Sequence, residues 1–502
     1  LPSPLSKPAA TTMPLKLRMH PVASADRSAR RDQIEVNLGP AISGVFEREH
    51  RNSTAPGVVA GARLVRGAFA VNEPAVLPAE GLAAAISLNT LDLDAWRALA
   101  DAETAATRPA AGSARTAADA SNARLALPGV MSISLQAGDL TLMGKRFERV
   151  AAAVNRRDGG WSANIEAPQA SGVVSWRDET AGRPDAPVVV RMRRLSVPAS
   201  QSTLVTQLLD TAPVHEVPAL DVDVEDFDIQ GKKFGRLTLN ASNVLRDGVR
   251  AWQLDRLAMT SPDAVLNATG RWGREPGMAA NAPQRMQMNF TLDVLNVGRF
   301  LDRLGVKDTM RDGTAKLEGD VNWRGSPMSI DYPTLGGSLT LSADKGQFLK
   351  SDPGVARLLG VLSLQSLTRR MTLDFRDVFS QGFAFDTVRA NIALSNGVLN
   401  TKDFRMRGVP ATVLMEGSAD IARETQDLHM IVLPDVNAGG ASVVYGLLAN
   451  PVVGLGTFLA QLFLREPLAK ALAHEYRVTG GWNDPHVEKL ERKANEAAAP
   501  MG

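Results

Sequence analysis

The chain of 502 residues contains no cysteine, and only 3 of its residues are tyrosine. The lack of cysteine excludes disulfides, thiolate nucleophiles and cysteine-ligated metals, although it does not fix the cellular compartment. An excess of one charge is also missing, because 56 basic residues face 54 acidic ones and the formal net charge is +2. A nucleic-acid binder usually presents a basic surface, so the composition argues against that class.

Recognisable catalytic motifs are absent as well. None of the 6 histidines stands at the spacing of a zinc protease, and the sequence has no nucleophile elbow, phosphate-binding loop or dinucleotide fingerprint. His429 lies between Leu428 and Met430 and is interpreted as a sheet residue. The acidic run Asp221–Asp228 alternates along a strand, which favours a solvated face over a cation site. We therefore predict a protein that is not an enzyme and that holds no metal or cofactor.

What the sequence does contain is strict alternation of apolar and polar residues. Every even position from Met286 to Val294 is apolar and every odd one polar, and Leu237 and Leu239 alternate with polar residues in the same way. Such strands have one apolar and one polar face, as in antiparallel sheets covered on one side. The sequence predicts a mainly β protein, with an elongated, curved antiparallel sheet that forms a repeating β-groove, short edge helices and a C-terminal helical element.

A weak repeat and several short helices organise the chain. Gly144-Lys145-Arg146-Phe147 recurs as Gly231-Lys232-Lys233-Phe234, and Gly382-Phe383-Ala384-Phe385 resembles a third copy. Helices are expected at 93–102, 202–209, 298–304 and 352–367. We divide the chain into a frayed segment 1–31, a first β segment with a helix 32–103, a linker or loop 104–123, repeated groove cassettes 124–285, a C-terminal groove region 286–435, a broken helical element 436–475, and a closing strand with tail 476–502.

The stretch Ala441–Leu464 is uncharged and apolar but is interrupted at Asn450-Pro451. Three interpretations remain open: a packed helical cap, a hairpin on or dipping into a membrane, and a true transmembrane span, which the proline break argues against. Arg465 and Lys470 follow it. The candidate membrane-contact residues share one face of the second half, and they are Leu455, Phe458, Leu459, Leu462 and Phe463.

Three blocks of sequence resemble the C-terminal portion of the YhdP family, which belongs to the AsmA-like envelope proteins of Gram-negative bacteria. They are 354–386, 404–411 and 476–485, the last ending in Trp482-Asn483-Asp484-Pro485. The resemblance covers about residues 290–490 and, through the style of the repeat, extends back to about residue 80. The chain begins Leu1-Pro2-Ser3 without a signal segment, so we expect it to be the C-terminal piece of a longer protein whose membrane anchor is not included.

The resemblance implies a periplasmic protein, anchored in the inner membrane, that carries phospholipid between the inner and outer membranes through an apolar β-groove. Its expected partners are phospholipids and the two membranes, with no nucleic acid; protein partners stay unknown. Two alternatives remain: an envelope scaffold whose apolar faces close into a dry core, and an unrecognised hydrolase with a carboxylate pair. The candidate groove residues come from alternation alone, and they are Met286, Met288, Phe290, Leu292, Met371, Leu373, Phe375, Phe385, Val413 and Met415.

Overall fold

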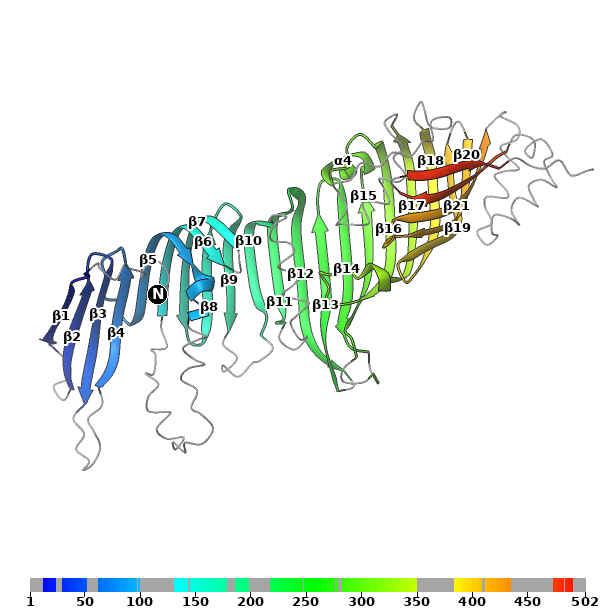
Figure 1. Ribbon diagram of the computed structural model, residues 1–502. Coiled ribbons are helices and arrows are strands. Elements are labelled where there is room, and N and C mark those ends of the chain that lie inside the picture. Colours follow the sequence, from blue (N-terminus) through cyan, green and yellow to red (C-terminus); the bar gives the residue numbers. More distant parts are fainter. Residues whose placement is uncertain are drawn as a thin grey trace, which may run out of the picture. The chain divides into compact units, whose positions relative to one another are not determined.

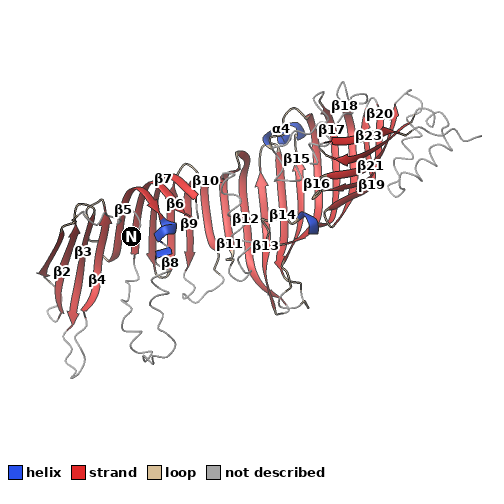
Figure 2. Cartoon of the chain, viewed as in Figure 1, coloured by secondary structure: helices blue, strands red, loops and turns tan. Residues whose placement is uncertain are grey.

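The computed structural model describes most of the chain, and most of the described residues are in strands (Figure 2). The described ranges are 12–23, 29–51, 62–96, 98–99, 131–142, 145–177, 186–197, 217–246, 248–275, 277–278, 282–349, 383–408, 411–434, 473–482 and 484–490. The chain divides into two compact units. The N-terminal unit comprises Leu1–Leu204 with Pro218–Phe227, and the C-terminal unit comprises Val205–Val217 with Asp228–Gly502.

Within the N-terminal unit, each strand pairs with the next one along the chain (Figure 1). The strands are β1 (Leu15–Val22), β2 (Ala29–Leu38), β3 (Ile42–Arg51), β4 (Ala62–Val71), β5 (Gly81–Asp92), β6 (Met131–Leu142), β7 (Lys145–Arg157), β8 (Gly160–Glu166), β9 (Ala170–Arg177) and β10 (Val188–Val197), followed by β11 (Leu220–Ile229) at the end of the unit. The pairings are antiparallel except for β4–β5 and β5–β6, which are parallel.

The C-terminal unit is an antiparallel meander from the first to the last of its described strands. Its elements are β12 (Lys232–Arg246), β13 (Val249–Thr260), β14 (Ala264–Gly273), β15 (Arg285–Val294), α4 (Val297–Arg303), β16 (Met310–Arg324), the 3₁₀ helix η3 (Tyr332–Thr334), β17 (Gly336–Phe348), β18 (Phe383–Ser395), β19 (Val398–Gly408), β20 (Ala411–Asp420), β21 (Thr425–Pro434), β22 (His474–Gly481) and β23 (Asp484–Lys489).

Tight turns explain why consecutive strands become neighbours. Asp158-Gly159 joins β7 to β8 and Asn396-Gly397 joins β18 to β19, each with positive φ at both residues. Two-residue turns of this kind match the right-handed twist of an antiparallel pair, and Asn-Gly and Asp-Gly are the dipeptides that adopt them most readily. The sequence therefore specifies these hairpins locally.

The mainly β fold predicted from alternation is confirmed, with the two parallel pairings as its departure from a purely antiparallel sheet. The alternating run at 286–294 is β15, and the helix expected at 298–304 is α4. Residues 93–96 and 98–99 are helical, in agreement with the predicted helix at 93–102. The helices expected at 202–209 and 352–367, the linker 104–123 and the apolar stretch Ala441–Leu464 lie outside the described residues.

A buried ion pair links β3 to β4 in the N-terminal unit. Glu47 is 3% exposed, and its carboxylate accepts hydrogen bonds from Nε and Nη2 of Arg66 at 2.8 and 2.9 Å. The hydrogen-bonded Arg66 guanidinium holds the pKa of Glu47 below its ordinary value of 4.5. Because the folded pKa is the lower one, the pair stabilises the fold fully above about pH 4.5.

We expect this stabilisation to be lost as the pH falls through the lowered, folded pKa of Glu47, when the carboxylate takes up a proton. Urea unfolding of the N-terminal unit, followed from roughly pH 7 to pH 3, measures this loss. Glu47→Gln should flatten the acid part of the profile. Glu80→Gln should leave it unchanged, because Glu80 is 61% exposed in its pair with Arg157. An unchanged profile for Glu47→Gln would contradict the prediction.

Candidate lipid-binding face

One face of the C-terminal sheet is apolar across all of its strands. The register pairs Leu292 of β15 with Leu266 of β14 and Leu317 of β16, and it pairs Leu317 in turn with Leu341 of β17. Directly opposite residues lie on the same face of a sheet, so these leucines form one row across the strands. Rows of directly paired residues two positions further along the strands are also mostly apolar. The apolar face therefore extends over the whole meander.

Glycines and phenylalanines pack against each other on this face. A Cβ on Gly319 would lie 2.3 Å from Cε1 of Phe290, its cross-strand partner, and one on Gly346 would lie 2.5 Å from Cζ of Phe385. Each ring therefore occupies the space that a side chain on its partner glycine would fill. A phenylalanine that covers a cross-strand glycine leaves an even apolar surface, because the glycine has no side chain that projects next to the ring.

β-Bulges keep the apolar residues on one face where the sequence changes phase. The pairing of β18 with β19 shifts between Phe385 and Thr387, and that of β19 with β20 shifts between Thr401 and Phe404. Each bulge adds one residue to one strand and reverses the alternation beyond it. Phe385 at an odd position and Val388 at an even one therefore belong to the same buried cluster.

The exposure of this face follows a pattern. A central stripe of half-exposed apolar side chains crosses the strands, whereas the residues at both ends of the strands are buried. The central stripe consists of Leu257, Met259, Leu266, Met288, Phe290, Leu292, Leu317, Leu341, Ile392, Phe404, Met415, Leu428 and Tyr476. Contiguous apolar surface that stays accessible commonly marks a binding site.

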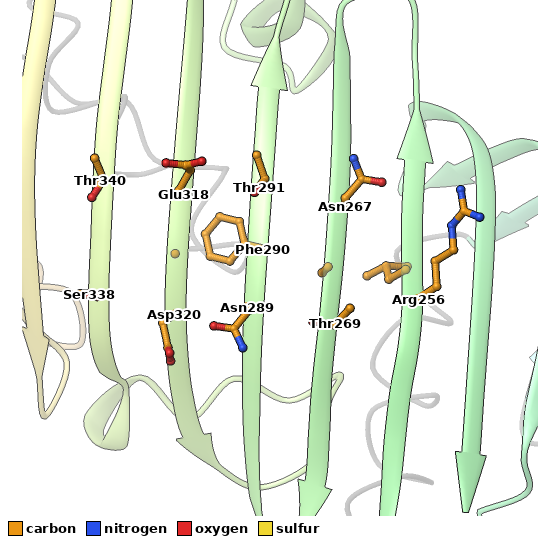
Figure 3. A pocket seen from close by; sticks show the side chains of 13 residues that line it. Arg256, Asn267, Thr269, Asn289, Phe290, Thr291, Glu318, Asp320, Ser338 and Thr340 are labelled. Carbon is orange, nitrogen blue, oxygen red and sulfur yellow. The ribbon is translucent and has the colours of Figure 1, made fainter.

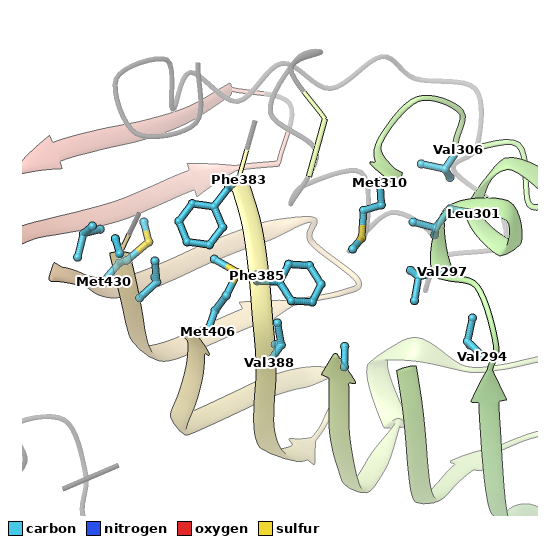
Figure 4. Close-up of a cluster of buried hydrophobic side chains, with 14 of the residues drawn as sticks. Val294, Val297, Leu301, Val306, Met310, Phe383, Phe385, Val388, Met406 and Met430 are labelled. Atoms are coloured by element: carbon cyan, nitrogen blue, oxygen red, sulfur yellow. The ribbon is translucent and has the colours of Figure 1, made fainter. Parts of the chain in front are cut away.

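The first margin of the central stripe is a buried cluster around α4 and the start of β18. Phe383 and Phe385 are 1% and 3% exposed, and the cluster also contains Leu301 of α4 and Met430 of β21 (Figure 4). Asn296 caps α4 by accepting a hydrogen bond from the backbone N–H of Arg299 at 2.9 Å. A Cβ on Gly298 would lie 2.6 Å from the Met310 carbonyl oxygen, so the helix rests directly on β16.

An ion pair links α4 to the β13–β14 hairpin that precedes it in the sequence. Arg303 donates through Nε at 3.0 Å, and also through Nη2, to a carboxylate oxygen of Asp263. Asp263 lies between β13 and β14 and is 4% exposed. Its backbone carbonyl accepts a hydrogen bond from the N–H of Leu295, just before α4. The first margin is thus held by side-chain and backbone contacts together.

The second margin is a row of large side chains at the opposite end of the strands. Trp252 of β13 pairs with Trp272 of β14, which pairs with Met286 of β15 and so with Trp323 of β16. All four are at most 5% exposed. Nε1 of Trp323 donates to the Ser326 carbonyl at 2.9 Å. These residues close the face on the side away from α4.

The reverse of the C-terminal sheet is polar. A shallow depression of about 620 Å³ crosses β13 to β17, and Figure 3 shows Asn267, Asn289, Thr291, Glu318 and Thr340 on neighbouring strands around it, together with Phe290. Most of its lining side chains are hydroxyl, amide or charged groups, and Leu257 and Phe290 of the central stripe also border it. Hydrocarbon gains little in such a place, so we take the apolar face as the candidate site.

The N-terminal unit has an apolar face of its own. Ile133 of β6 pairs with Ala84 of β5 and Val154 of β7, and Val154 pairs with Ala163 of β8. Most of this row is half-exposed, and Phe69 of β4, which pairs with Ala84, is 38% exposed. Both units therefore present partly accessible apolar sheet surface.

Comparison with known proteins assigns the chain that carries these faces to a family. The family model described as YhdP protein matches residues 1–487. The chain belongs to the YhdP family. The match covers nearly the whole sequence, so it extends well beyond the three blocks on which the resemblance rested, and it includes the N-terminal unit and the C-terminal unit up to residue 487.

One curated relative of this YhdP-family chain is the intermembrane phospholipid transporter YhdP of Escherichia coli (strain K12). It is 28% identical over 270 residues, which are 54% of this chain and 20% of the relative. The chain therefore spans about one fifth of the length of that relative. No solved structure matches the chain.

The structure brings the described members of the predicted groove set of this YhdP-family chain onto one face. Met286, Met288, Phe290 and Leu292 alternate along β15, and Phe385, Val413 and Met415 lie on the same face of β18 and β20. Met286, Phe385 and Val413 are at most 3% exposed and belong to the margins, whereas the other four are half-exposed. Whether any of the seven contacts lipid stays a prediction.

The remaining predicted site residues lie outside the described residues. They are the groove candidates Met371, Leu373 and Phe375 and the membrane-contact candidates Leu455, Phe458, Leu459, Leu462 and Phe463. Sequence reasoning also missed several residues of the central stripe, such as Leu266, Leu317 and Leu341. Their alternation with polar neighbours in β14, β16 and β17 was the available signal.

Four further sequence expectations concern the described residues: a membrane-spanning helix, a metal site, the acidic run and His429. Within the described ranges, no helix is long and apolar enough to cross a membrane, and no group of three or more histidine and acidic side chains is placed to hold a metal ion. Asp221 of the acidic run forms an ion pair with Arg191 of β10 at 2.7 Å. His429 lies on β21 between Leu428 and Met430, as predicted.

Proposed function

We propose that this chain is part of a bridge-like lipid transfer protein, and that phospholipid acyl chains lie on the apolar faces of its sheets. The observation that carries the proposal is the central stripe, a line of half-exposed apolar side chains between two buried margins. A sheet face of this kind needs an apolar cover, and acyl chains supply one.

The energetics favour transfer along such a face. Moving hydrocarbon through water costs about 0.8 kcal/mol per CH₂, so a chain of about 16 carbons faces a barrier of roughly 13 kcal/mol. A continuous apolar face lowers that cost at every step, because the chain exchanges one apolar neighbour for the next. Such transfer needs no catalytic group, which fits a protein that is not an enzyme.

The family supports the same direction. The E. coli relative carries the name intermembrane phospholipid transporter, so the proposed cargo is phospholipid and the proposed surroundings are two membranes. We infer a periplasmic location for this chain, between an inner and an outer membrane. The segment Ala441–Leu472 stays a candidate for delivering the face to a membrane.

Mass spectrometry of lipids that co-purify with the chain tests the proposal directly. A lipid conduit should retain diacyl phospholipid in amounts comparable with the protein. A scaffold with a dry core, the alternative function, should retain only the trace amounts found on an unrelated soluble control protein. That result would overturn the proposal.

Photocrosslinking gives the residue-level prediction. A photoreactive amino acid placed in turn at positions 287 to 292 of β15 should label lipid only at the even positions. Met288, Phe290 and Leu292 lie on the apolar face, whereas Asn289 and Thr291 lie on the polar one. Equal labelling at odd and even positions would contradict a face-specific site.

A further inference from the structure

The sequence repeat marks a change of phase in the alternation of three strands. Three residues after its phenylalanine comes a branched aliphatic residue, and the pairs are Phe147 with Val150, Phe234 with Leu237, and Phe385 with Val388. Phe147 packs against the buried cluster that contains Val150, and Phe385 and Val388 share another. Residues three positions apart would lie on opposite faces of a regular strand, so the alternation changes phase between them.

The second copy of the repeat, at the start of β12, has the backbone of a bulge. Gly235 has a φ of +79°, and a Cβ there would lie 2.3 Å from a carbonyl oxygen of β13. Glycine with positive φ is a usual first residue of a bulge in an antiparallel pair. Leu237 pairs with Met259 of the central stripe, so Phe234, on the other side of the bulge, lies on the apolar face. Lys232, two residues before Phe234, lies on that face as well.

The third copy shows what surrounds this position. Phe383 precedes Phe385 by two residues, as Lys232 precedes Phe234. Phe383 is 1% exposed and belongs to the buried cluster at the first margin of the central stripe. The second copy thus carries a cation where the third carries a phenylalanine, and this cation lies beside apolar side chains at the edge of the face.

Lys232 lies next to the end of α4. Its Cε is 3.9 Å from the position of a Cβ built on Gly305, and the backbone carbonyl of Lys233 accepts a hydrogen bond from Nη1 of Arg303 at 3.5 Å. Lys232 is half-exposed, and burial lowers the pKa of its ammonium group from the ordinary value of 10.5. No residue that the structure describes forms a hydrogen bond or an ion pair with this ammonium group. A partly desolvated cation without a counter-ion favours an anionic ligand.

The apolar face continues from Lys232 to the central stripe. Leu237, which pairs with Met259 of that stripe, lies five positions further along β12. Five residues correspond to about 17 Å at roughly 3.3 Å per strand residue. Half of a bilayer hydrocarbon core, the depth that one acyl chain fills, is about 15 Å. An acyl chain with its head at Lys232 therefore has the length to extend along β12 as far as the central stripe.

We propose that Lys232 forms a headgroup site at the first margin, where its ammonium group binds the phosphate of a phospholipid whose acyl chains extend along β12 to the central stripe. The inference rests on the proposed function and adds to it the orientation of the lipid and a residue that recognises it. Charge complementarity selects the phosphate, because a cation beside an apolar surface matches a ligand with an anionic head and hydrocarbon tails. Lysine suits this place because its aliphatic stem covers apolar surface while its ammonium group reaches the headgroup.

Fluorescence quenching at one labelled position tests the site. The chain has no cysteine, so Leu239→Cys gives the full chain a single thiol for a fluorophore, opposite Leu257 of the central stripe. Two lipids with the same nitroxide-labelled acyl chains serve as probes: phosphatidylglycerol, and diacylglycerol, which has no phosphate. Lys232→Met should weaken binding of phosphatidylglycerol about tenfold and leave diacylglycerol unchanged, because it removes the ammonium group and keeps an apolar side chain. Lys232→Arg should keep most of the affinity.

Lys233→Met is the matched control. Lys233 is the next residue along β12, is exposed and lies on the opposite face, so this variant removes the same charge away from the site. It should bind both probes as the labelled parent does. Circular dichroism establishes that each variant is folded, and hydrogen exchange of the amides in α4 shows whether loss of the ammonium group changes the margin itself.

The outcomes separate the two proposals. If neither probe quenches the labelled parent, the proposed lipid function fails at this face. If both probes bind and Lys232→Met weakens neither, or weakens both equally, the headgroup site is wrong while the lipid function stands. Faster exchange in α4 with unchanged binding of phosphatidylglycerol would assign Lys232 to the end of the helix and overturn the proposal. Inorganic phosphate in millimolar excess should not displace phosphatidylglycerol, and displacement would mean a site for free anions instead.

Discussion

Phe290→Asp should abolish lipid binding and transfer by this chain. Phe290 lies near the middle of the central stripe, and its ring covers Gly319 of the next strand. A carboxylate there would meet hydrocarbon whenever an acyl chain passes, at a cost of about 2.5–3.5 kcal/mol by the scale for charges within membranes. That corresponds to a loss of roughly 100-fold in affinity, since about 1.4 kcal/mol is tenfold. Transfer of fluorescent phospholipid between donor and acceptor vesicles measures the loss.

Thr291→Asp supplies the matched control for this prediction. It adds the same charge one residue along β15, but Thr291 alternates with Phe290 and therefore lies on the polar face of the sheet. Lipid binding should therefore stay within about twofold of the wild type. Both variants should keep the wild-type circular dichroism spectrum, because position 290 is half-exposed. Equal loss in the two variants would argue for a general effect of charge and against a face-specific site.

Asp263→Ala should locally destabilise the margin of the central stripe at α4 by about 3 kcal/mol. The substitution removes the carboxylate that pairs with the Arg303 guanidinium. The Arg303 side chain is 26% exposed. Removal of one partner from a buried pair typically costs about 3–5 kcal/mol, and the partial exposure of Arg303 favours the lower end. Hydrogen exchange of the amides in α4, from Val297 to Arg303, measures the local free energy of opening.

The double variant Asp263→Ala/Arg303→Ala provides the control. It removes both charges, so it should be less destabilised than Asp263→Ala alone, and the difference gives the coupling energy. Glu318→Ala breaks a surface pair with Lys316 in which both side chains are about half exposed, and it should change stability by less than about 0.5 kcal/mol. Additive effects of Asp263→Ala and Arg303→Ala would mean that the pair does not fasten α4.

The fold class followed from local chemistry that a single sequence carries. Alternation from Met286 to Val294 has the period of a half-buried strand, and Asn396-Gly397 has the backbone freedom that a tight hairpin requires. The helix expected at 298–304 differs from α4 by one residue at either end. These features depend on near neighbours in the chain, so the sequence alone was sufficient for them.

Other features depend on register, which the sequence did not reveal. The row from Leu266 through Leu292 and Leu317 to Leu341 exists only because four strands pair without slipping, and a shift by one residue would put each leucine on the polar face. Bulges such as the one after Phe385 change the phase of alternation in ways that only the pairing shows. The parallel pairings of β5 were missed for the same reason, because alternation is identical in parallel and antiparallel strands.

By itself the sequence determined that this protein is built of strands with one apolar face, that it lacks the residues of common catalytic sites, and that it resembles the YhdP family. Only the tertiary structure decided which apolar residues are closed into margins and which remain half-exposed. Met286 and Met288 are two residues apart and chemically identical, yet one is 1% exposed among tryptophans and the other lies in the central stripe. The physical reason is that exposure depends on what lies on the neighbouring strands. Met286 lies between Trp272 of β14 and Trp323 of β16, whereas Met288 lies between Gly270 and Val321 of the same two strands.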